Sequence, residues 1–180
     1  MNTMRCARPS TASAVDNLKN IFARNCTVRR IDKPTAAAFI ARYHRLGETT
    51  CRYRYGLFVD RSTGEDELKL PQGTLVAVAE FSNARRWTKG EQRISSYEWI
   101  RYASLEGVRI VGGMGKVLNA FVEDVHPDDV MSYADVSWPD GGNVYRALGF
   151  EDEGLVERPG FTCRKFRLKL DGQTVISRLP

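Results

Sequence analysis

Three glycines lie within four positions where the chain turns into a helix with one apolar face. Gly112, Gly113 and Gly115 precede the segment 116–125, whose apolar residues recur at helical spacing. Backbone N–H groups at such a helix start are uncovered and lie at the positive end of the helix dipole, where a phosphate can bind. The turn matches neither a P-loop nor the GxGxxG dinucleotide motif. It is a candidate anion site, with a plain tight turn as the alternative.

A second group of residues combines positive charge with aromatic rings. Between positions 52 and 93, arginines and a lysine are interleaved with Tyr53, Tyr55 and Trp87. Cations contact phosphates and aromatic rings stack on bases, so these residues form a candidate nucleic-acid surface, with a solvated loop as the alternative. The cations are Arg52, Arg54, Arg85, Arg86, Lys89 and Arg93.

A third feature is Glu98 and Arg101, three positions apart on an expected strand. Successive side chains of a strand alternate between its faces, so these two are predicted to face opposite sides. Arg101 is the one expected in the cleft, where it would join the DNA-binding cations.

The composition predicts a single globular domain for these groups. The chain has 180 residues, 42% hydrophobic and 27% charged, which is typical of a compact protein and not of a disordered one. It contains neither an apolar run of about 20 residues nor a secretory signal, so a cytoplasmic protein without a membrane partner is expected. The net charge of +5 favours an anionic partner. Four scattered cysteines indicate neither a zinc cluster nor a disulfide framework.

The hydrophobic pattern predicts a mixed α/β domain. Asp32 is a helix N-cap with Pro34 in the first turn, and Gly149 ends a late helix. The segment 83–93 is expected to be a connector, and residues 15–22 a short helix. The expected strands are 26–31, 52–59, 74–81, 95–103, 108–111, 130–136, 150–156 and 161–170, and the expected helices are 36–43, 116–125 and 139–148.

Three segments are therefore expected along the chain. Residues 1–25 form an N-terminal arm or short helix, 26–170 form the domain, and 171–180 form a C-terminal tail.

One late segment gives the glycine turn a context. Asn143 and Tyr145 precede the pair Gly149-Phe150. With the glycine turn, this segment resembles the GCN5-related N-acetyltransferase (GNAT) superfamily over roughly residues 26–170. The resemblance implies a mixed, mainly antiparallel sheet flanked by helices. It also implies acetyl-CoA or a related acyl donor, with its pyrophosphate on the glycine turn and contacts from Val111, Gly112, Gly113, Met114, Gly115, Lys116 and Asn143.

The same resemblance implies a general-acid role for Tyr145, which would protonate the departing thiolate. A phenol with a pKa of about 10 is a suitable proton source for that step. The motif usually has Gln or Arg three residues before its first glycine, where this chain has Ile110; Arg109 is one residue out of register.

Four short matches suggest a narrower resemblance: 43–44, 96–101, 111–116 and 133–138 are similar to the phage Mu Mom family. That resemblance implies a transferase that converts adenine in DNA to N6-carbamoylmethyladenine and so protects phage DNA from restriction. It implies DNA as partner and a phage- or prophage-encoded protein in a bacterial host, with a homodimer as one candidate assembly. Trp87 or Trp138 would support the flipped adenine.

Within the Mom-like hypothesis, His44 and Asp135 converge beside Tyr145 as catalytic groups. Asp135 is expected at a strand end, where it can act as a base or an orienting group. The same three residues are alternatively an iron site. Two rival functions remain: an N-acetyltransferase acting on a small-molecule or protein amine, and a noncatalytic DNA-binding module.

Overall fold

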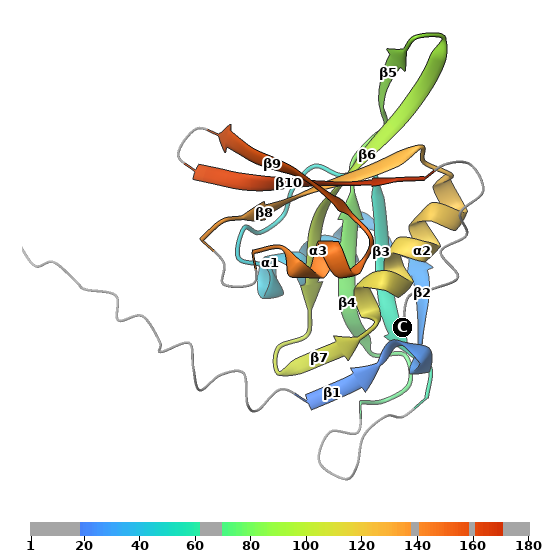
Figure 1. Cartoon of the computed structure of the whole chain (residues 1–180). Helices are drawn as coiled ribbons and strands as arrows, with labels where there is room; N and C mark the ends of the chain where they lie inside the picture. The colour runs from blue at the N-terminus through green and yellow to red at the C-terminus, as the bar shows by residue number, and fades with distance from the viewer. Residues whose placement is uncertain (1–18, 62–69, 138–140, 159–160, 171–180) are drawn as a thin grey trace, which may run out of the picture.

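The computed structural model describes residues 19–61, 70–137, 141–158 and 161–170. Its elements follow the order of Figure 1. The strands are β1 Lys19–Phe22, β2 Cys26–Arg30, β3 Tyr53–Val59, β4 Leu75–Phe81, β5 Arg85–Lys89, β6 Gln92–Ser104, β7 Val108–Val111, β8 Asp129–Asp135, β9 Glu151–Arg158 and β10 Phe161–Lys169. The helices are α1 Lys33–Tyr43, α2 Gly113–Val125 and α3 Asn143–Ala147, with a 3-10 turn η1 at Ala23–Asn25.

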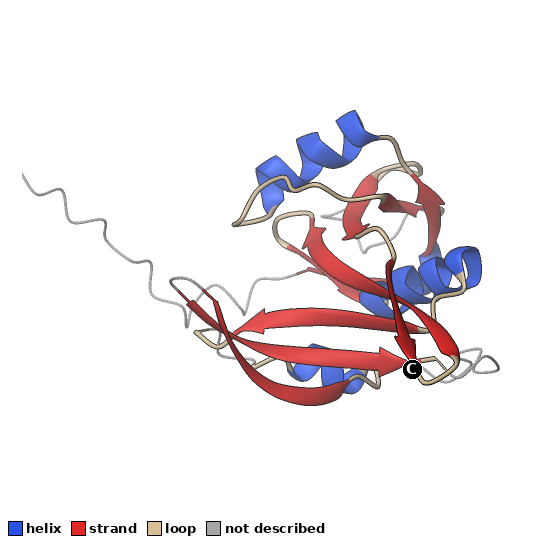
Figure 2. Cartoon of the chain, turned by 90° about the horizontal axis from the view of Figure 1, so that it is seen from above, coloured by secondary structure: helices blue, strands red, loops and turns tan. Residues whose placement is uncertain are grey.

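One sheet of eight strands forms the centre of the protein. Its order is β2-β3-β4-β6-β8-β10-β9, and β5 pairs with β6 beside this path. Only the β6–β8 pair is parallel; the other neighbours in this sheet are antiparallel. Helices lie on both sides of the strands (Figure 2). The predicted α/β class, with a mixed and mainly antiparallel sheet flanked by helices, is confirmed.

The two faces of the sheet bury different helices. On the α1 face, Val78 and Ala103 pack against Phe39 and Ile40 of α1. On the α2 face, Phe81 stacks on Phe121 of α2 with ring centroids 3.9 Å apart. These stripes fully bury large apolar side chains, which supply most of the driving force for folding.

Local signals start the helices where the sequence predicts them. The Asp32 carboxylate accepts a hydrogen bond from the Thr35 N–H at 2.8 Å, which caps α1. Gly112 adopts a φ of 75° at the N-cap of α2, a conformation that side chains other than glycine seldom take. No side chain caps α2, so its first N–H groups remain available.

Two segments differ from the prediction. Residues 19–22 form strand β1, parallel to β7, and not the end of a short helix; Ile21 is buried in the core. Residues 15–18 lie outside the described part of the chain. Residues 85–89 form strand β5 and not a connector, so β5 and the start of β6 make a hairpin, the β5–β6 arm, that projects from the domain (Figure 1).

Among the residues that the structure describes, no helix is long and apolar enough to cross a bilayer.

Candidate functional site

The neighbouring strands β6 and β8 separate part-way along their length. They pair only from Ser96 to Glu98 and from Asp129 to Met131. Beyond this point β6 continues to Ser104 beside β4, and no described strand pairs with its other edge. The Ile100 and Arg101 oxygens accept from the Arg101 and Trp99 side chains, so the backbone groups that can pair with an extended ligand are the alternate ones beyond Arg101 that face this edge. We call this opening the β6–β8 cleft.

The glycine turn lies between two pockets. A pocket of about 530 Å³ is lined by Tyr102, the turn and Leu148 of the α3 C-terminus. A second, of about 440 Å³, lies on the other side of the turn, against Phe22 and Lys116. Both volumes suit a coenzyme-sized ligand. Of the predicted donor contacts, Val111, Gly112 and Gly115 line both pockets, and Gly113 and Met114 line the first.

Two predicted donor contacts have protein partners. The Lys116 ammonium donates hydrogen bonds to the backbone oxygens of Ala23 and Cys26, so it ties the N-terminal segment to α2. Asn143 is exposed at the start of α3, where its side-chain oxygen accepts from Arg146 at 3.0 Å. Arg109 lines the first pocket and forms no ion pair with any described residue.

Tyr145 is held by other aromatic rings on the α2 side of the sheet. Its ring stacks on Phe166 with centroids 5.3 Å apart and meets Trp99 and Phe150 edge-on. Trp99 lies on β6 and Phe166 on β10, so Tyr145 bridges the two sides of the cleft. Such packing fixes the direction of the phenol.

Glu98 and Arg101 share one face, contrary to the prediction. The register between β4 and β6 shifts after Glu80, which pairs with Arg101, whereas Phe81 pairs with Trp99. Ile100 is therefore an extra residue, and this bulge reverses the alternation that a regular strand would give. Both side chains consequently lie on the α1 face, opposite Trp99.

Glu80 is a buried carboxyl on the same face. Its side chain is 1% exposed, its Oε2 has no hydrogen-bond partner among the described residues, and its Oε1 lies 3.9 Å from Arg54 Nε. Burial raises the pKa of Glu80, while Cys51 and Arg54 oppose the rise. Burial and Glu80 together raise the pKa of the Cys51 thiol to about 12, so it stays protonated. Glu80 carries no signal of function in the sequence, because its strand is otherwise apolar.

His44 follows α1 and Asp135 ends β8, and an ion pair connects the 44–47 turn to β8 on the α1 side of the cleft. Arg45 binds Asp135 at 2.8 Å, and Asp135 also accepts from the Ser137 hydroxyl and N–H. The hydrogen bonds from Ser137 and Arg45 lower the pKa of Asp135 to about 2, so it is ionised and weakly basic, as suits an orienting group. The Leu46 N–H donates to His44 Nδ1 at 3.2 Å. Burial, then Arg101 and Arg45, lower the pKa of His44.

The described residues contain no group of three or more His, Cys, Asp and Glu side chains that could hold a metal ion. Asp135 already uses both its oxygens for Arg45 and Ser137. The predicted iron site at His44, Asp135 and Tyr145 therefore gains no support from this arrangement.

The predicted DNA-binding cations do not form one surface. Arg85, Arg86 and Lys89 are exposed on the β5–β6 arm, and Arg52 is exposed before β3. Arg54 lies instead beside the buried Glu80, and Arg101 donates to the backbone oxygen of Gly47 at 3.3 Å. Trp87 is on the arm, 43% exposed, whereas Trp138 lies outside the described residues.

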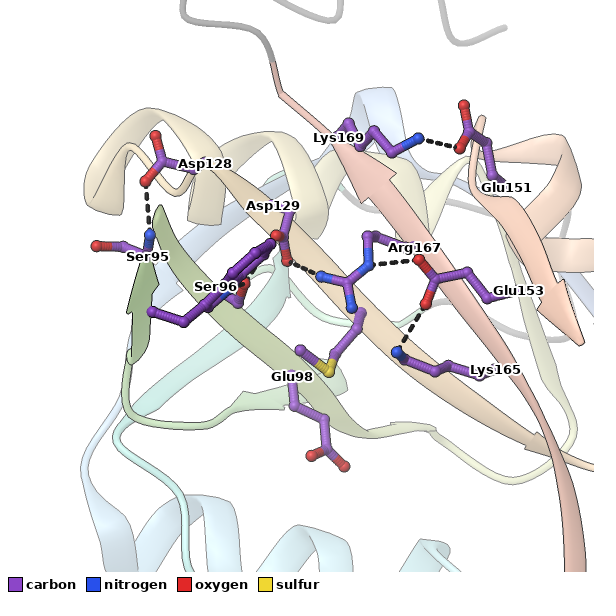
Figure 3. A network of polar contacts seen from close by, with 12 residues as sticks. Ser95, Ser96, Glu98, Asp128, Asp129, Glu151, Glu153, Lys165, Arg167 and Lys169 are labelled. Carbon is purple, nitrogen blue, oxygen red and sulfur yellow. Dashed lines mark hydrogen bonds and ion pairs between the residues drawn. The ribbon is translucent and has the colours of Figure 1, made fainter. Parts of the chain in front are cut away.

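At the closed end of the cleft, polar groups pair with one another across five strands (Figure 3). The Trp87 indole donates to the Ser96 hydroxyl at 2.7 Å, and this hydroxyl donates to Asp129 at 2.7 Å. Asp129 binds Arg167 at 2.8 Å, and Arg167 in turn binds Glu153, which also binds Lys165 at 2.7 Å. We call these six residues the closed-end network.

Solved structures share this architecture. NAA60 of Arabidopsis thaliana, determined with acetyl-CoA, aligns with a TM-score of 0.55 and 14% identity over 82% of this chain and 99% of its own. The chain has the GNAT fold. The ribosomal-protein-S5-alanine acetyltransferase of Vibrio fischeri gives a TM-score of 0.55 and 13% identity over 83% of this chain and 96% of its own. The spermidine/spermine N-acetyltransferase SpeG of Vibrio cholerae gives a TM-score of 0.52 and 12% identity over 82% of this chain and 94% of its own.

No family model matches the chain, and no curated protein matches it. The predicted GNAT fold is confirmed by the structural likeness, whereas none of these findings supports the narrower Mom-like resemblance.

Proposed function

We propose that this protein is an N-acyltransferase that moves an acyl group from a coenzyme A thioester to an amine. The observation that carries the proposal is the β6–β8 cleft, which has an uncapped glycine turn at its α2 side and carboxylates on its α1 face. The acetyl-CoA bound to NAA60 and the amine acceptors named for the structural neighbours support the same assignment.

The residues around the glycine turn fit a coenzyme's phosphates. A Cβ added to Gly113 would lie 2.7 Å from Ile110 Cγ2, so the absence of a side chain keeps this wall of the pocket in place. The N–H groups of Gly113, Met114 and Gly115 precede the first internal hydrogen bond of α2, made by Lys116 N–H to Gly112. Arg109 adds a positive charge at the pocket wall. The free edge of β6 beyond Arg101 would hold the amide arm of the coenzyme.

The groups that would transfer protons lie on opposite faces of the sheet. When bound, the coenzyme supplies a thioester carbonyl that an amine can attack and a thiolate that leaves. Glu98, half-buried on the α1 face beside Arg85, would take the proton of the incoming ammonium. Glu80 is too covered to contact an amine. Tyr145, fixed among aromatic rings on the opposite side, would give a proton to the thiolate. Arg101 and Asp135 would position the 44–47 turn over the acceptor.

The proposal is tested by calorimetry with acetyl-CoA and by thiol release in the presence of a polyamine, a free peptide N-terminus and an amino sugar. We expect acetyl-CoA to bind, and Glu98→Gln to lower kcat/KM about 100-fold without changing that affinity. Glu123→Gln, an exposed position on α2, is the matched control. A parent protein with no affinity for acetyl-CoA contradicts the function, and an unchanged rate in Glu98→Gln contradicts the role of that residue.

A second candidate function keeps the transferase chemistry but takes adenine N6 in DNA as the amine. The observation in its favour is the β5–β6 arm, on which Arg86, Lys89 and Arg93 are exposed and form no ion pair with described residues. These cations would contact phosphates. Reversing the charge at Arg85 and Arg86 should weaken DNA binding and reduce its salt dependence. Mass spectrometry of nucleosides from DNA co-expressed with the parent separates the candidates, because only the second yields modified adenine.

A further inference from the structure

Tyr102 places a phenol directly beneath the glycine turn. It lies on β6 one residue beyond Arg101, on the α2 face, and it lines the pocket of about 530 Å³. A Cβ added to Gly113 would meet the Tyr102 hydroxyl oxygen at 2.9 Å, so this hydroxyl is in contact with the first residue of α2. It therefore lies beside the N–H groups to which the proposed function assigns the phosphates.

This hydroxyl forms no hydrogen bond with any residue that the structure describes. Tyr102 is half-buried and lines the pocket, so its hydroxyl keeps its hydrogen-bonding capacity for a molecule bound there. Burial, with a smaller contribution from Cys26, raises the pKa of Tyr102 well above its usual value. The phenol therefore stays protonated and keeps a hydrogen to donate.

Two other positions near the turn do not offer it a donor. Ile110 occupies the position where a polar side chain is usual in the resembling motif, and the Lys116 ammonium is directed to Ala23 and Cys26. Ser104 and Arg109 also line the pocket, and Tyr102 is distinguished by a hydroxyl that lies against Gly113, the first residue of α2.

We propose that Tyr102 is a donor-positioning residue, whose hydroxyl donates a hydrogen bond to a phosphate oxygen held at the start of α2. The inference rests on the proposed function in one respect, namely that the bound donor carries a diphosphate. It assigns to a β6 side chain a contact that otherwise depends on backbone N–H groups. A hydrogen bond to a charged oxygen is among the stronger ones in proteins.

The test compares Tyr102→Phe with Tyr97→Phe, the same substitution on the same strand but outside the pocket. Calorimetry is done with CoA, inorganic pyrophosphate and pantetheine. For Tyr102→Phe we expect about tenfold weaker binding of CoA and pyrophosphate, which corresponds to about 1.4 kcal/mol, with pantetheine unchanged. Tyr97→Phe should bind all three probes as the parent does.

Stability separates this role from a structural one. Without ligand, Tyr102→Phe should unfold at the same temperature as the parent or a higher one, because it removes an unpaired hydroxyl. A lower unfolding temperature with unchanged pyrophosphate affinity overturns the inference. If the parent binds pyrophosphate through Tyr102 but does not bind CoA, the inference stands and the proposed function fails. If the parent binds neither, both fail.

Discussion

The two ends of the β6–β8 pair show opposite ways of treating polar groups. At the closed end, Ser96 and Asp129 are partners in the strand register, and their side chains join a network in which every ion has an opposite ion. At the open end, the β6 edge beyond Arg101 pairs with no described strand, and neither the first N–H groups of α2 nor the Tyr102 hydroxyl is bonded to a described side chain. Within a few residues, the same two strands thus change from side chains paired by opposite charge to groups that face the pocket of the glycine turn.

This difference distinguishes residues that stabilise the cleft from residues that would bind a ligand in it. Where the two strands separate, backbone groups lose their hydrogen-bond partners, which lowers the stability of the fold. Contacts where the strands still pair must offset that loss. The closed-end network provides a fixed junction from which β6 and β8 diverge. We therefore expect substitutions at the closed end to lower stability, and substitutions at the open end to lower ligand binding with little change in stability.

Asp129→Ala is expected to have the largest effect. The Asp129 side chain is 6% exposed and that of Arg167 is 14% exposed, so the substitution leaves a buried guanidinium with one fewer anion. Breaking one partner of a buried pair typically costs about 3 kcal/mol or more. Urea denaturation should show this loss. Lys169→Ala is the control: it breaks the exposed Glu151 pair and should cost less than about 1 kcal/mol. Equal losses in the two variants would show that the network does not hold the junction.

Gly115→Glu is expected to have the next largest effect, which is on the binding of acetyl-CoA. Gly115 borders both pockets at the start of α2, where a carboxylate suits the helix dipole but repels phosphate. Affinity for acetyl-CoA should fall more than about 100-fold, or about 2.7 kcal/mol, with the circular dichroism spectrum unchanged. Gly90→Glu adds the same charge at the tip of the β5–β6 arm, where an added Cβ would meet no other part of the protein within 4 Å, and should bind acetyl-CoA normally. Comparable losses in both variants would remove the glycine turn from the site.

The sequence predicts the elements of the open end better than their side-chain directions. The glycine pattern and the apolar stripe after it indicate α2, and the Asp32 cap indicates α1, because these signals are local. The faces of Glu98 and Arg101 depend on the Ile100 bulge, which only pairing with β4 reveals. Tyr102 resembles ordinary core packing in the sequence, because its contact with Gly113 is made through folding of β6 against α2.

The sequence contains weaker signals for the closed end and the β5–β6 arm, because both depend on contacts between strands. Asp129, Glu153 and Arg167 come from three strands, and each alone is typical of a charged surface residue. Strand β5 is exposed at all five positions, so it lacks the alternating hydrophobic pattern that predicts a strand. Strand β1 is only four residues long and depends on β7 for its hydrogen bonds.

The smallest effect is expected from the carboxylate at the other end of β8. Asp135 makes hydrogen bonds to Ser137 and Arg45 that resemble those of Asp129, but it lies at the open end, where water screens them. Its pKa in the folded protein is about 2, below the value of about 3.9 expected when unfolded. The charged form therefore stabilises the fold above about pH 4, and this contribution is lost as the pH falls toward 2.

We accordingly expect the stability difference between the parent and Asp135→Asn to be constant from pH 7 to about pH 5 and to shrink from pH 4 to pH 2. Carbon-detected NMR titration of the Asp135 carboxyl provides the direct measurement, and urea denaturation across the same pH range provides the thermodynamic one. Because Asp135→Asn retains a side-chain oxygen for Ser137, most of what it removes is the charge that faces Arg45. A titration midpoint near 4 would mean that Arg45 does not hold the 44–47 turn against β8. The acceptor side of the cleft would then lack a fixed connection of the kind that the closed-end network provides.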